Sequence, residues 1–455
     1  RSRGGGARSA LLDAARDAGL PLVLAYGETA ACVMAAVTGD LTEAPGAVFI
    51  GAGPGVAAAA AGLAHALLDR APMLLLTDRH PGDVLGGKAS LAVEAASAGY
   101  WIAHAARLAM AEPRGPVHLD VPPDVATQSA VPSAASCRPD PLAPPDAPAL
   151  DEAARLIAGA ARPLLALGLH CRAADAPWLR ALAEALPAPA LVTAKAKGAL
   201  PDPHPLVLGV LGGEAPDDRV LARADLIVAI GLDAAEPVPR AWWTRVPVLA
   251  VGPAPAGDAP PPFCEVVGAI GLALEELALR LAGRPRADWD VAELDRLKRA
   301  RPLTAAPAGL APERVVRLAR EATEAGTLAA VDAGAHWDAV MGAWQAVTPG
   351  EFLAPNGATR GFALPAAIAA HLERPARRVV AFTDAAGLLA AAPELETAKR
   401  LAAPVVLVVF GGADAVRLAQ GFGVAAYAAD SEPAVAQALS RALGVRGPAV
   451  LGVFA

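Results

Sequence analysis

Short apolar runs alternate with Ala- and Leu-rich segments along the whole chain, and this alternation restricts the possible folds more than any other feature. Runs such as Met73-Leu74-Leu75-Leu76 and 405–410 are apolar at every position rather than at every second one. Continuous apolar runs of this length are typical of strands that are buried on both faces, as in a parallel sheet covered by helices. The pattern therefore predicts α/β architecture.

The runs fall into three blocks, which proline-rich connectors separate. Strands are predicted at 22–24, 48–50, 73–76, 117–121, 164–167, 190–192, 226–230, 248–251, 328–331, 379–382, 405–410 and 449–454, with helices between them, for example at 176–186, 364–372 and 393–401. The connectors cover 122–148 and 283–312. We expect three consecutive doubly wound, mainly parallel-sheet domains at residues 1–125, 150–282 and 313–455.

Composition excludes several classes of protein. The 39 Lys and Arg residues against 46 Asp and Glu give a net charge of -7, which argues against a nucleic-acid partner. The four cysteines form no C-x-x-C pair, so we expect neither a disulfide framework nor a zinc site, and a cytoplasmic location. The uncharged stretch 47–68 contains Gly53-Pro54-Gly55, which predicts a strand, a turn and a helix rather than a membrane span.

Candidate chemical groups follow the predicted strands, where doubly wound sheets bind their ligands. Glu28 follows 22–24, Gly53 and Pro54 follow 48–50, Ala335 and His336 follow 328–331, and Asp384 follows 379–382. Each has an ordinary explanation on its own: Glu28 could serve a helix dipole, and Asp384 could be an N-cap. The glycine turn is no dinucleotide fingerprint, because the third glycine of that motif is replaced by Val56.

Taken in order, the motifs resemble the thiamine-diphosphate-dependent enzymes, in the branch of acetolactate synthase, benzoylformate decarboxylase and pyruvate oxidase. The motifs that carry the resemblance are Gly27-Glu28-Thr29-Ala30-Ala31, Gly53-Pro54-Gly55, Asp69-Arg70-Ala71-Pro72, Gly115-Pro116-Val117-His118-Leu119-Asp120-Val121-Pro122, Lys197-Gly198-Ala199-Leu200-Pro201, Asp332-Ala333-Gly334-Ala335-His336, Gly361-Phe362-Ala363-Leu364-Pro365 and Glu394-Leu395-Glu396-Thr397-Ala398. The resemblance covers nearly the whole chain, in the family's domain order: pyrimidine-binding, central and diphosphate-binding.

The resemblance implies a function, a cofactor and a set of site residues. It implies an enzyme, a lyase or transferase, that decarboxylates or carboligates a small 2-oxo acid, with Glu28 as the catalytic group that hydrogen-bonds the cofactor's pyrimidine. The cofactor-binding residues that it implies are Gly53, Pro54, Ala335, His336, Thr359, Gly361 and Asp384. Asp384 would also bind Mg²⁺. Because the family's active site lies between two subunits, the resemblance implies a homodimer or homotetramer.

Three departures from the family pattern leave an alternative open. Thr383-Asp384-Ala385 replaces Gly-Asp-Gly, Arg360 replaces a bulky apolar residue before Gly361, and Gly411-Gly412 follows the 405–410 strand where the family has asparagines. The alternative is a non-catalytic relative that keeps the fold as a binding or assembly protein. Some members of the family bind FAD or a CoA ester in the central domain, and nothing in this sequence demands either.

Overall fold

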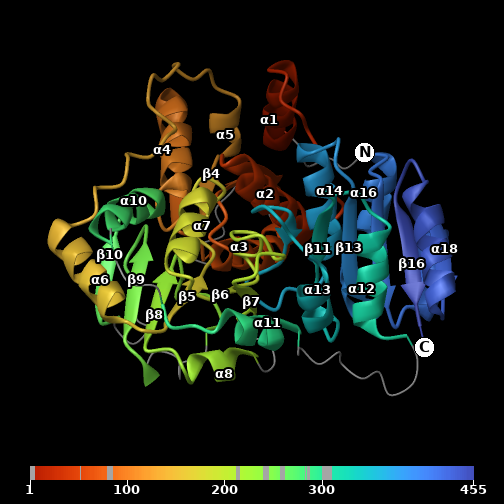
Figure 1. Cartoon of the computed structure of the whole chain (residues 1–455). Helices are drawn as coiled ribbons and strands as arrows, with labels where there is room; N and C mark the ends of the chain where they lie inside the picture. The colour runs from red at the N-terminus through yellow and green to blue at the C-terminus, as the bar shows by residue number, and fades with distance from the viewer. Residues whose placement is uncertain are drawn as a thin grey trace.

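The computed structural model describes residues 6–51, 53–78, 86–211, 216–238, 245–256, 262–281, 283, 287–299 and 310–454. Over these residues the chain forms three sheets of four, six and six strands, and every strand pairs with its neighbours in parallel. The strand orders are β1-β2-β4-β3, β10-β9-β8-β5-β6-β7 and β12-β11-β13-β14-β16-β15. The predicted α/β fold class is confirmed, and we call each sheet with its helices the first, central and third domain (Figure 1).

The bounds of the elements are as follows. The first domain contains α1 (Gly6–Asp17), α2 (Glu28–Thr42), β1 (Gly46–Ile50), α3 (Pro54–Leu68), β2 (Met73–Thr77), β3 (Ala89–Ala92), α4 (Ala98–Met110), β4 (Pro116–Asp120) and α5 (Pro123–Ala126). The central domain contains α6 (Ala147–Gly159), β5 (Pro163–Leu167), α7 (Ala176–Ala185), β6 (Ala190–Val192), β7 (Val207–Val210), α8 (Pro216–Leu221), β8 (Leu226–Ile230), β9 (Val248–Gly252), β10 (Cys264–Val267) and α10 (Ile270–Arg280). The helix α11 (Val291–Arg299) lies within the stretch expected to be a connector.

The third domain contains α12 (Pro312–Glu321), β11 (Leu328–Val331), α13 (Trp337–Ala343), β12 (Phe352–Leu353), α14 (Ala363–Glu373), β13 (Val379–Asp384), α15 (Ala385–Ala391), α16 (Glu394–Arg400), β14 (Val405–Phe410), α17 (Ala413–Gly421), β15 (Ala425–Ala429), α18 (Glu432–Leu443) and β16 (Ala449–Val453). Its central strands are apolar and buried on both faces, as β13 and β14 show. This burial is what a parallel sheet between two helix layers requires.

The strand predicted at 22–24 is wrong, and the reason is physical. This segment is extended but has no strand beside it, and Leu22 and Leu24 are exposed. The Leu24 carbonyl accepts a hydrogen bond from Arg400 of α16, and Glu394 of the same helix accepts hydrogen bonds from the N–H groups of Tyr26 and Gly27, just after the segment. An apolar run becomes a strand only where a neighbouring strand offers a ladder.

The helix α2 joins the first domain to the third. It packs against α3 on one side and against α14 on the other (Figure 1). Val33 and Met34 of α2 lie in the same apolar cluster as Leu364 and Ile368 of α14. The start of α2, where Glu28 lies, is therefore fixed between two domains. In the described part of the chain, no helix is long and apolar enough to span a membrane.

Candidate functional site

Glu28 is the first residue of α2, and its carboxylate is directed toward the start of α3. A Cβ atom added to Gly55 would lie 3.0 Å from Glu28 Oε1, so the glycine permits this close approach. The hydroxyl of Thr29 donates to the carbonyl of Ala58 at 2.7 Å and fastens the two helices together. Within the described ranges, the half-buried Glu28 carboxylate has no hydrogen-bond donor and no cation as its partner.

The start of α3 forms the other wall of this region. Gly53 has a φ of +93°, which favours glycine, and Pro54 occupies the first turn of the helix, where it is tolerated. Both residues are exposed, as binding residues must be before a ligand arrives. The N-termini of α2 and α3 thus both lie near Glu28.

Cys32 lies one turn further along α2 and is fully buried. Burial, with a smaller contribution from the Glu28 charge, raises the pKa of the Cys32 thiol to about 12. The thiol therefore stays protonated near neutral pH and cannot act as a nucleophile.

A second group of polar side chains lies at the carboxyl ends of β11 and β13 in the third domain. A Cβ atom added to Gly334 would lie 2.7 Å from both Asp384 Oδ2 and His336 Cε1, so these two side chains converge over the glycine. His336 is 2% exposed, and neither of its ring nitrogens has a hydrogen bond of good geometry among the described residues. Burial lowers the pKa of His336, although the Asp384 charge opposes this, so the imidazole is neutral at neutral pH.

Asp384 and Asp332 already have structural partners. Asp384 is the N-cap of α15, and its Oδ1 accepts a hydrogen bond from the Gly387 N–H at 2.8 Å, so the ordinary explanation considered for it is confirmed. The buried Asp332 carboxylate accepts hydrogen bonds from the N–H groups of Phe362 and Ala363 and from the Thr383 hydroxyl. Burial raises the pKa of Asp332, although these hydrogen bonds lower it.

The loop before α14 contains Thr359, Arg360 and Gly361. The Thr359 hydroxyl lies 3.3 Å from His65 Nδ1 of α3, and Gly361 has a φ of +77°. Arg360 is exposed and makes no ion pair with any described residue. The loop is thus held against the first domain with the Arg360 side chain toward solvent. The roles predicted for Thr359, Gly361 and Ala335 stay predictions.

The residues around Asp384 do not fit a Mg²⁺ site. Mg²⁺ demands an octahedral set of oxygen ligands, usually with at least one or two carboxylates. Next to Asp384 in the sheet lies Phe410, whose ring stacks on His336 with the ring centres 5.3 Å apart. Gly411 and Gly412 follow and bring no side-chain oxygen. The described residues contain no cluster of three His, Cys, Asp or Glu side chains that could hold a metal ion. The role of Asp384 as a ligand stays a prediction.

The two predicted halves of the site are not brought together within the described part of one chain. Glu28 belongs to the first domain, whereas Ala335, His336 and Asp384 belong to the third. No hydrogen bond, ion pair or ring contact joins Glu28 to any of them. The subunit boundary that the resemblance implies for the active site also stays a prediction.

Sequence reasoning missed the residues that fasten this region. Glu394, buried in the third domain, accepts hydrogen bonds from the backbone just before Glu28. Asp69, at the end of α3, accepts from Lys195 of the central domain and from the Asn356 N–H of the third. Both residues stand in quoted motifs, but their partners are far away in sequence, so spacing alone gave no signal.

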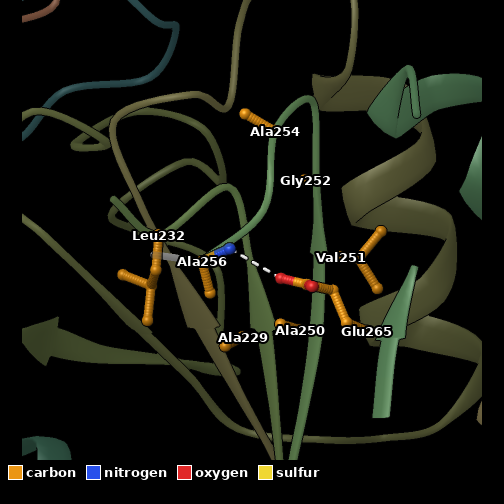
Figure 2. A pocket seen from close by; sticks show the side chains of 8 residues that line it. All are labelled: Ala229, Leu232, Ala250, Val251, Gly252, Ala254, Ala256 and Glu265. Carbon is orange, nitrogen blue, oxygen red and sulfur yellow. Dashed lines mark hydrogen bonds between the residues drawn. The ribbon is translucent and has the colours of Figure 1, made fainter. Parts of the chain in front are cut away.

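A pocket of the central domain lies beside β8, β9 and β10. It has about 280 Å³ of empty space, open solvent included, and Glu265 on its wall accepts a hydrogen bond from the Ala256 N–H at 2.6 Å (Figure 2). Between the ends of β5 and β8, where such a fold binds ligands, the Glu236 carboxylate accepts from the Leu169 and Asp233 N–H groups instead. These features do not favour the FAD or CoA possibility.

Comparison with known proteins gives a consistent result. Three domain families of the thiamine pyrophosphate enzymes match: the N-terminal TPP binding domain over residues 4–95, the central domain over 150–277 and the C-terminal TPP binding domain over 332–412. A solved structure of a putative thiamin diphosphate-dependent enzyme from Mycobacterium smegmatis has the same fold. Its TM-score is 0.80 at 23% identity, with 98% of each chain covered.

Curated relatives point the same way. A probable 2-ketoarginine decarboxylase of Pseudomonas aeruginosa is 30% identical, with 86% of this chain and 75% of the relative covered. The large subunit of acetolactate synthase isozyme 1 of Escherichia coli is 29% identical, and the chain spans 76% of its own length and 66% of that relative's. The catabolic acetolactate synthase of Raoultella terrigena is 28% identical, with 97% and 89% covered. The chain belongs to the thiamine pyrophosphate enzyme family.

Proposed function

We propose that this protein binds thiamine diphosphate and decarboxylates or carboligates a small 2-oxo acid, with Glu28 as its catalytic group. The observation that carries the proposal is the Glu28 carboxylate, which lies at the meeting point of two helix N-termini and has no other partner among the described residues. The names of the relatives, acetolactate synthases and a 2-ketoarginine decarboxylase, support this reaction class.

The residues around Glu28 suit a carboxylate that shares a proton with a ring nitrogen. The missing side chain of Gly55 leaves space beside the Glu28 carboxylate. The hydrogen bond from the Thr29 hydroxyl to the Ala58 carbonyl holds the starts of α2 and α3 against each other. Bound thiamine diphosphate would supply an electron sink for the carboxyl group that leaves the 2-oxo acid. Gly53, Pro54, Ala335, His336, Thr359 and Gly361 are the proposed cofactor contacts, and no step is assigned to Mg²⁺.

Calorimetric titration with thiamine diphosphate, with and without Mg²⁺, tests cofactor binding. Assays with pyruvate, 2-oxobutyrate and benzoylformate then test the reaction. We expect Glu28→Gln to bind the cofactor within a few-fold of the original protein and to lose about 10²–10⁴-fold in turnover, the usual contribution of general acid–base catalysis. Absence of binding heat at millimolar cofactor would refute the proposal.

The second candidate is a non-catalytic relative that keeps the fold for binding or assembly. Phe410 beside Asp384, followed by two glycines, favours it, because these three positions bring no side-chain oxygen that could bind a metal next to Asp384. The two candidates differ in one measurement. Decarboxylation that disappears in Glu28→Gln rules out the non-catalytic reading, whereas cofactor binding without turnover of any 2-oxo acid supports it.

The proposal includes a homodimer or homotetramer in the cytoplasm. Since the two predicted halves of the site lie in different domains without contact, a second copy of the chain would be needed to complete it. The described cysteines are free, which fits a reducing compartment. Light scattering after size-exclusion chromatography measures the assembly, and a stable monomer at micromolar concentration that still turns over substrate contradicts this part.

A further inference from the structure

The backbone that leads into Glu28 is held by one helix of the third domain. Glu394, at the start of α16, accepts hydrogen bonds from the Gly27 N–H at 2.8 Å and from the Tyr26 N–H at 3.3 Å. Its side chain lies in the interior, with the residue 1% exposed. Hydrogen bonds to a buried carboxylate are among the stronger ones in proteins, and two donors here share one acceptor group.

The other end of the same helix holds the same segment. Arg400, the last residue of α16, donates from Nη2 to the Leu24 carbonyl, and its Nε lies 3.3 Å from the Glu396 carboxylate. The Glu394 carboxylate thus accepts hydrogen bonds from two N–H groups of the segment, and the Arg400 guanidinium donates a hydrogen bond to one of its carbonyl groups. These side chains replace the ladder that a neighbouring strand would have provided.

We propose that Glu394 is a positioning residue for Glu28. Gly27 is the N-cap of α2 and Glu28 is the next residue, so the two hydrogen bonds from Glu394 fix the point at which the Glu28 side chain leaves the backbone. The inference rests on the proposed function of Glu28. Catalytic groups tolerate little displacement, since a shift of about 1 Å can cost on the order of 10²-fold in rate.

The helix α16, which carries Glu394, also follows closely after Asp384 in the chain. The helix α15 begins at Asp384, and α16 follows it after a short turn. The elements α15 and α16 thus connect Asp384 to Glu394, whose hydrogen bond holds the backbone before Glu28.

The test compares Glu394→Ala and Glu394→Gln with Lys399→Gln, a control on the same helix whose side chain hydrogen-bonds the Phe422 carbonyl and not the segment 24–27. Hydrogen exchange followed by mass spectrometry reports on the Tyr26 and Gly27 amides. The exchange of the cofactor's thiazolium proton in D₂O, quenched and read by NMR, reports on Glu28. Calorimetry gives the cofactor Kd.

We expect Glu394→Ala to raise amide exchange in the segment and to slow the thiazolium proton exchange by about 10–100-fold, with the Kd nearly unchanged. Glu394→Gln keeps one acceptor oxygen, so it retains the fold and recovers most of the rate. Lys399→Gln matches the original protein. The double variant with Glu28→Gln is no slower than Glu28→Gln alone, because Glu394 acts through Glu28.

The outcomes separate the two proposals. If Glu28→Gln slows the proton exchange but Glu394→Ala and Glu394→Gln leave both exchange rates unchanged, the positioning role is wrong and the proposed function stands. If the losses add in the double variant, Glu394 acts elsewhere and the inference also falls. If Glu28→Gln itself leaves the thiazolium exchange unchanged, the proposed function is the one that fails.

Discussion

Glu236 is a buried carboxyl whose proton makes stability depend on pH. Burial raises its pKa from 4.5 to about 7, although hydrogen bonds from Thr193 and from the Asp233 and Leu169 N–H groups oppose this. Between these two values the folded chain keeps a proton that the unfolded chain has lost. Its contribution to stability is therefore complete below 4.5 and is lost as the pH rises through about 7.

We expect the free energy of unfolding to fall as the pH rises from about 5 to about 8, by at most about 1.4 kcal/mol per unit from this group. Urea denaturation at several pH values measures it. In Glu236→Gln, which cannot ionise, the dependence is shallower. An identical slope in both proteins would show that Glu236 does not hold the extra proton.

Local chemistry explains which site residues could be predicted from the sequence. Glu28 and Asp384 each lie at the start of a helix that follows an apolar segment. In both cases a few adjacent residues are enough to predict this position. Glu394 could not be found in this way, because its bond to Gly27 joins residues 367 positions apart. A pattern within one segment does not specify which distant backbone will need an acceptor.

At the scale of elements, the contact between α2 and α3 depends on Gly62. A Cβ atom added there would overlap the Cβ of Cys32 and lie 3.0 Å from the Thr29 carbonyl oxygen. We expect Gly62→Ala to separate the two helices and to lower the free energy of unfolding by about 1–3 kcal/mol, as overpacking does. Because both helices flank Glu28, turnover falls as well.

Gly159→Ala at the end of α6 is the matched control, since nothing lies within 4 Å of a Cβ added there. We expect it to be neutral or to stabilise by a few tenths of a kcal/mol, because alanine favours helix. Urea denaturation of the two variants gives the comparison. Equal stability of Gly62→Ala and Gly159→Ala would contradict the close helix contact.

Most strands were predictable because a strand buried on both faces must be apolar throughout. Some of the strands that were not predicted do not meet that condition, whereas β7 and β12 are largely buried but short. The strands β3 and β15 are only partly buried and contain small or polar residues, so their sequences give no strong apolar run. The segment 22–24 has the reverse problem, since it is apolar but lacks a neighbouring strand. Periodicity reports burial, whereas strand formation also needs a partner.

At the scale of the whole molecule, a buried charge network joins the first and central domains. His170 of the central domain lies 2.9 Å from Asp233 and 3.5 Å from Glu112 of the first domain. Burial alone would lower its pKa, but the two carboxylates outweigh this, so the pKa of His170 is raised. Its stabilising contribution is therefore complete below the ordinary value of 6.5 and is lost as the pH rises through the raised pKa.

We expect the contact between the first and central domains to become less stable at alkaline pH. The amides in peptides around Glu112 then exchange faster. The charged groups Arg70, Arg114, Arg172 and Glu236 also border the network, so the change is a weakening rather than complete separation. Hydrogen exchange measured at about pH 6 and about pH 9, corrected for intrinsic rates, checks this prediction. In His170→Gln the corrected difference becomes smaller, and only the part that comes from other titrating groups such as Glu236 remains. An undiminished difference would assign the whole effect to those groups.

Asp69 connects all three domains through one carboxylate. It is 4% exposed and accepts hydrogen bonds from Lys195 Nζ of the central domain at 3.0 Å and from the Asn356 N–H of the third domain at 2.8 Å. Asp40 shares the Lys195 ammonium at 2.9 Å. Since both hydrogen-bond donors to Asp69 belong to other domains, we expect the unfolding of the three domains to be coupled at this point.

We expect Asp69→Asn to leave Lys195 with one carboxylate in place of two and to destabilise the protein by up to about 3–5 kcal/mol, as breaking a buried pair does. Calorimetry would then resolve separate transitions where the original protein shows one. Asp414→Asn is the control, because the Asp414–Arg417 pair is exposed and contributes little. A single transition at an unchanged temperature in Asp69→Asn would mean that the packing of α2 against α14 couples the domains without it.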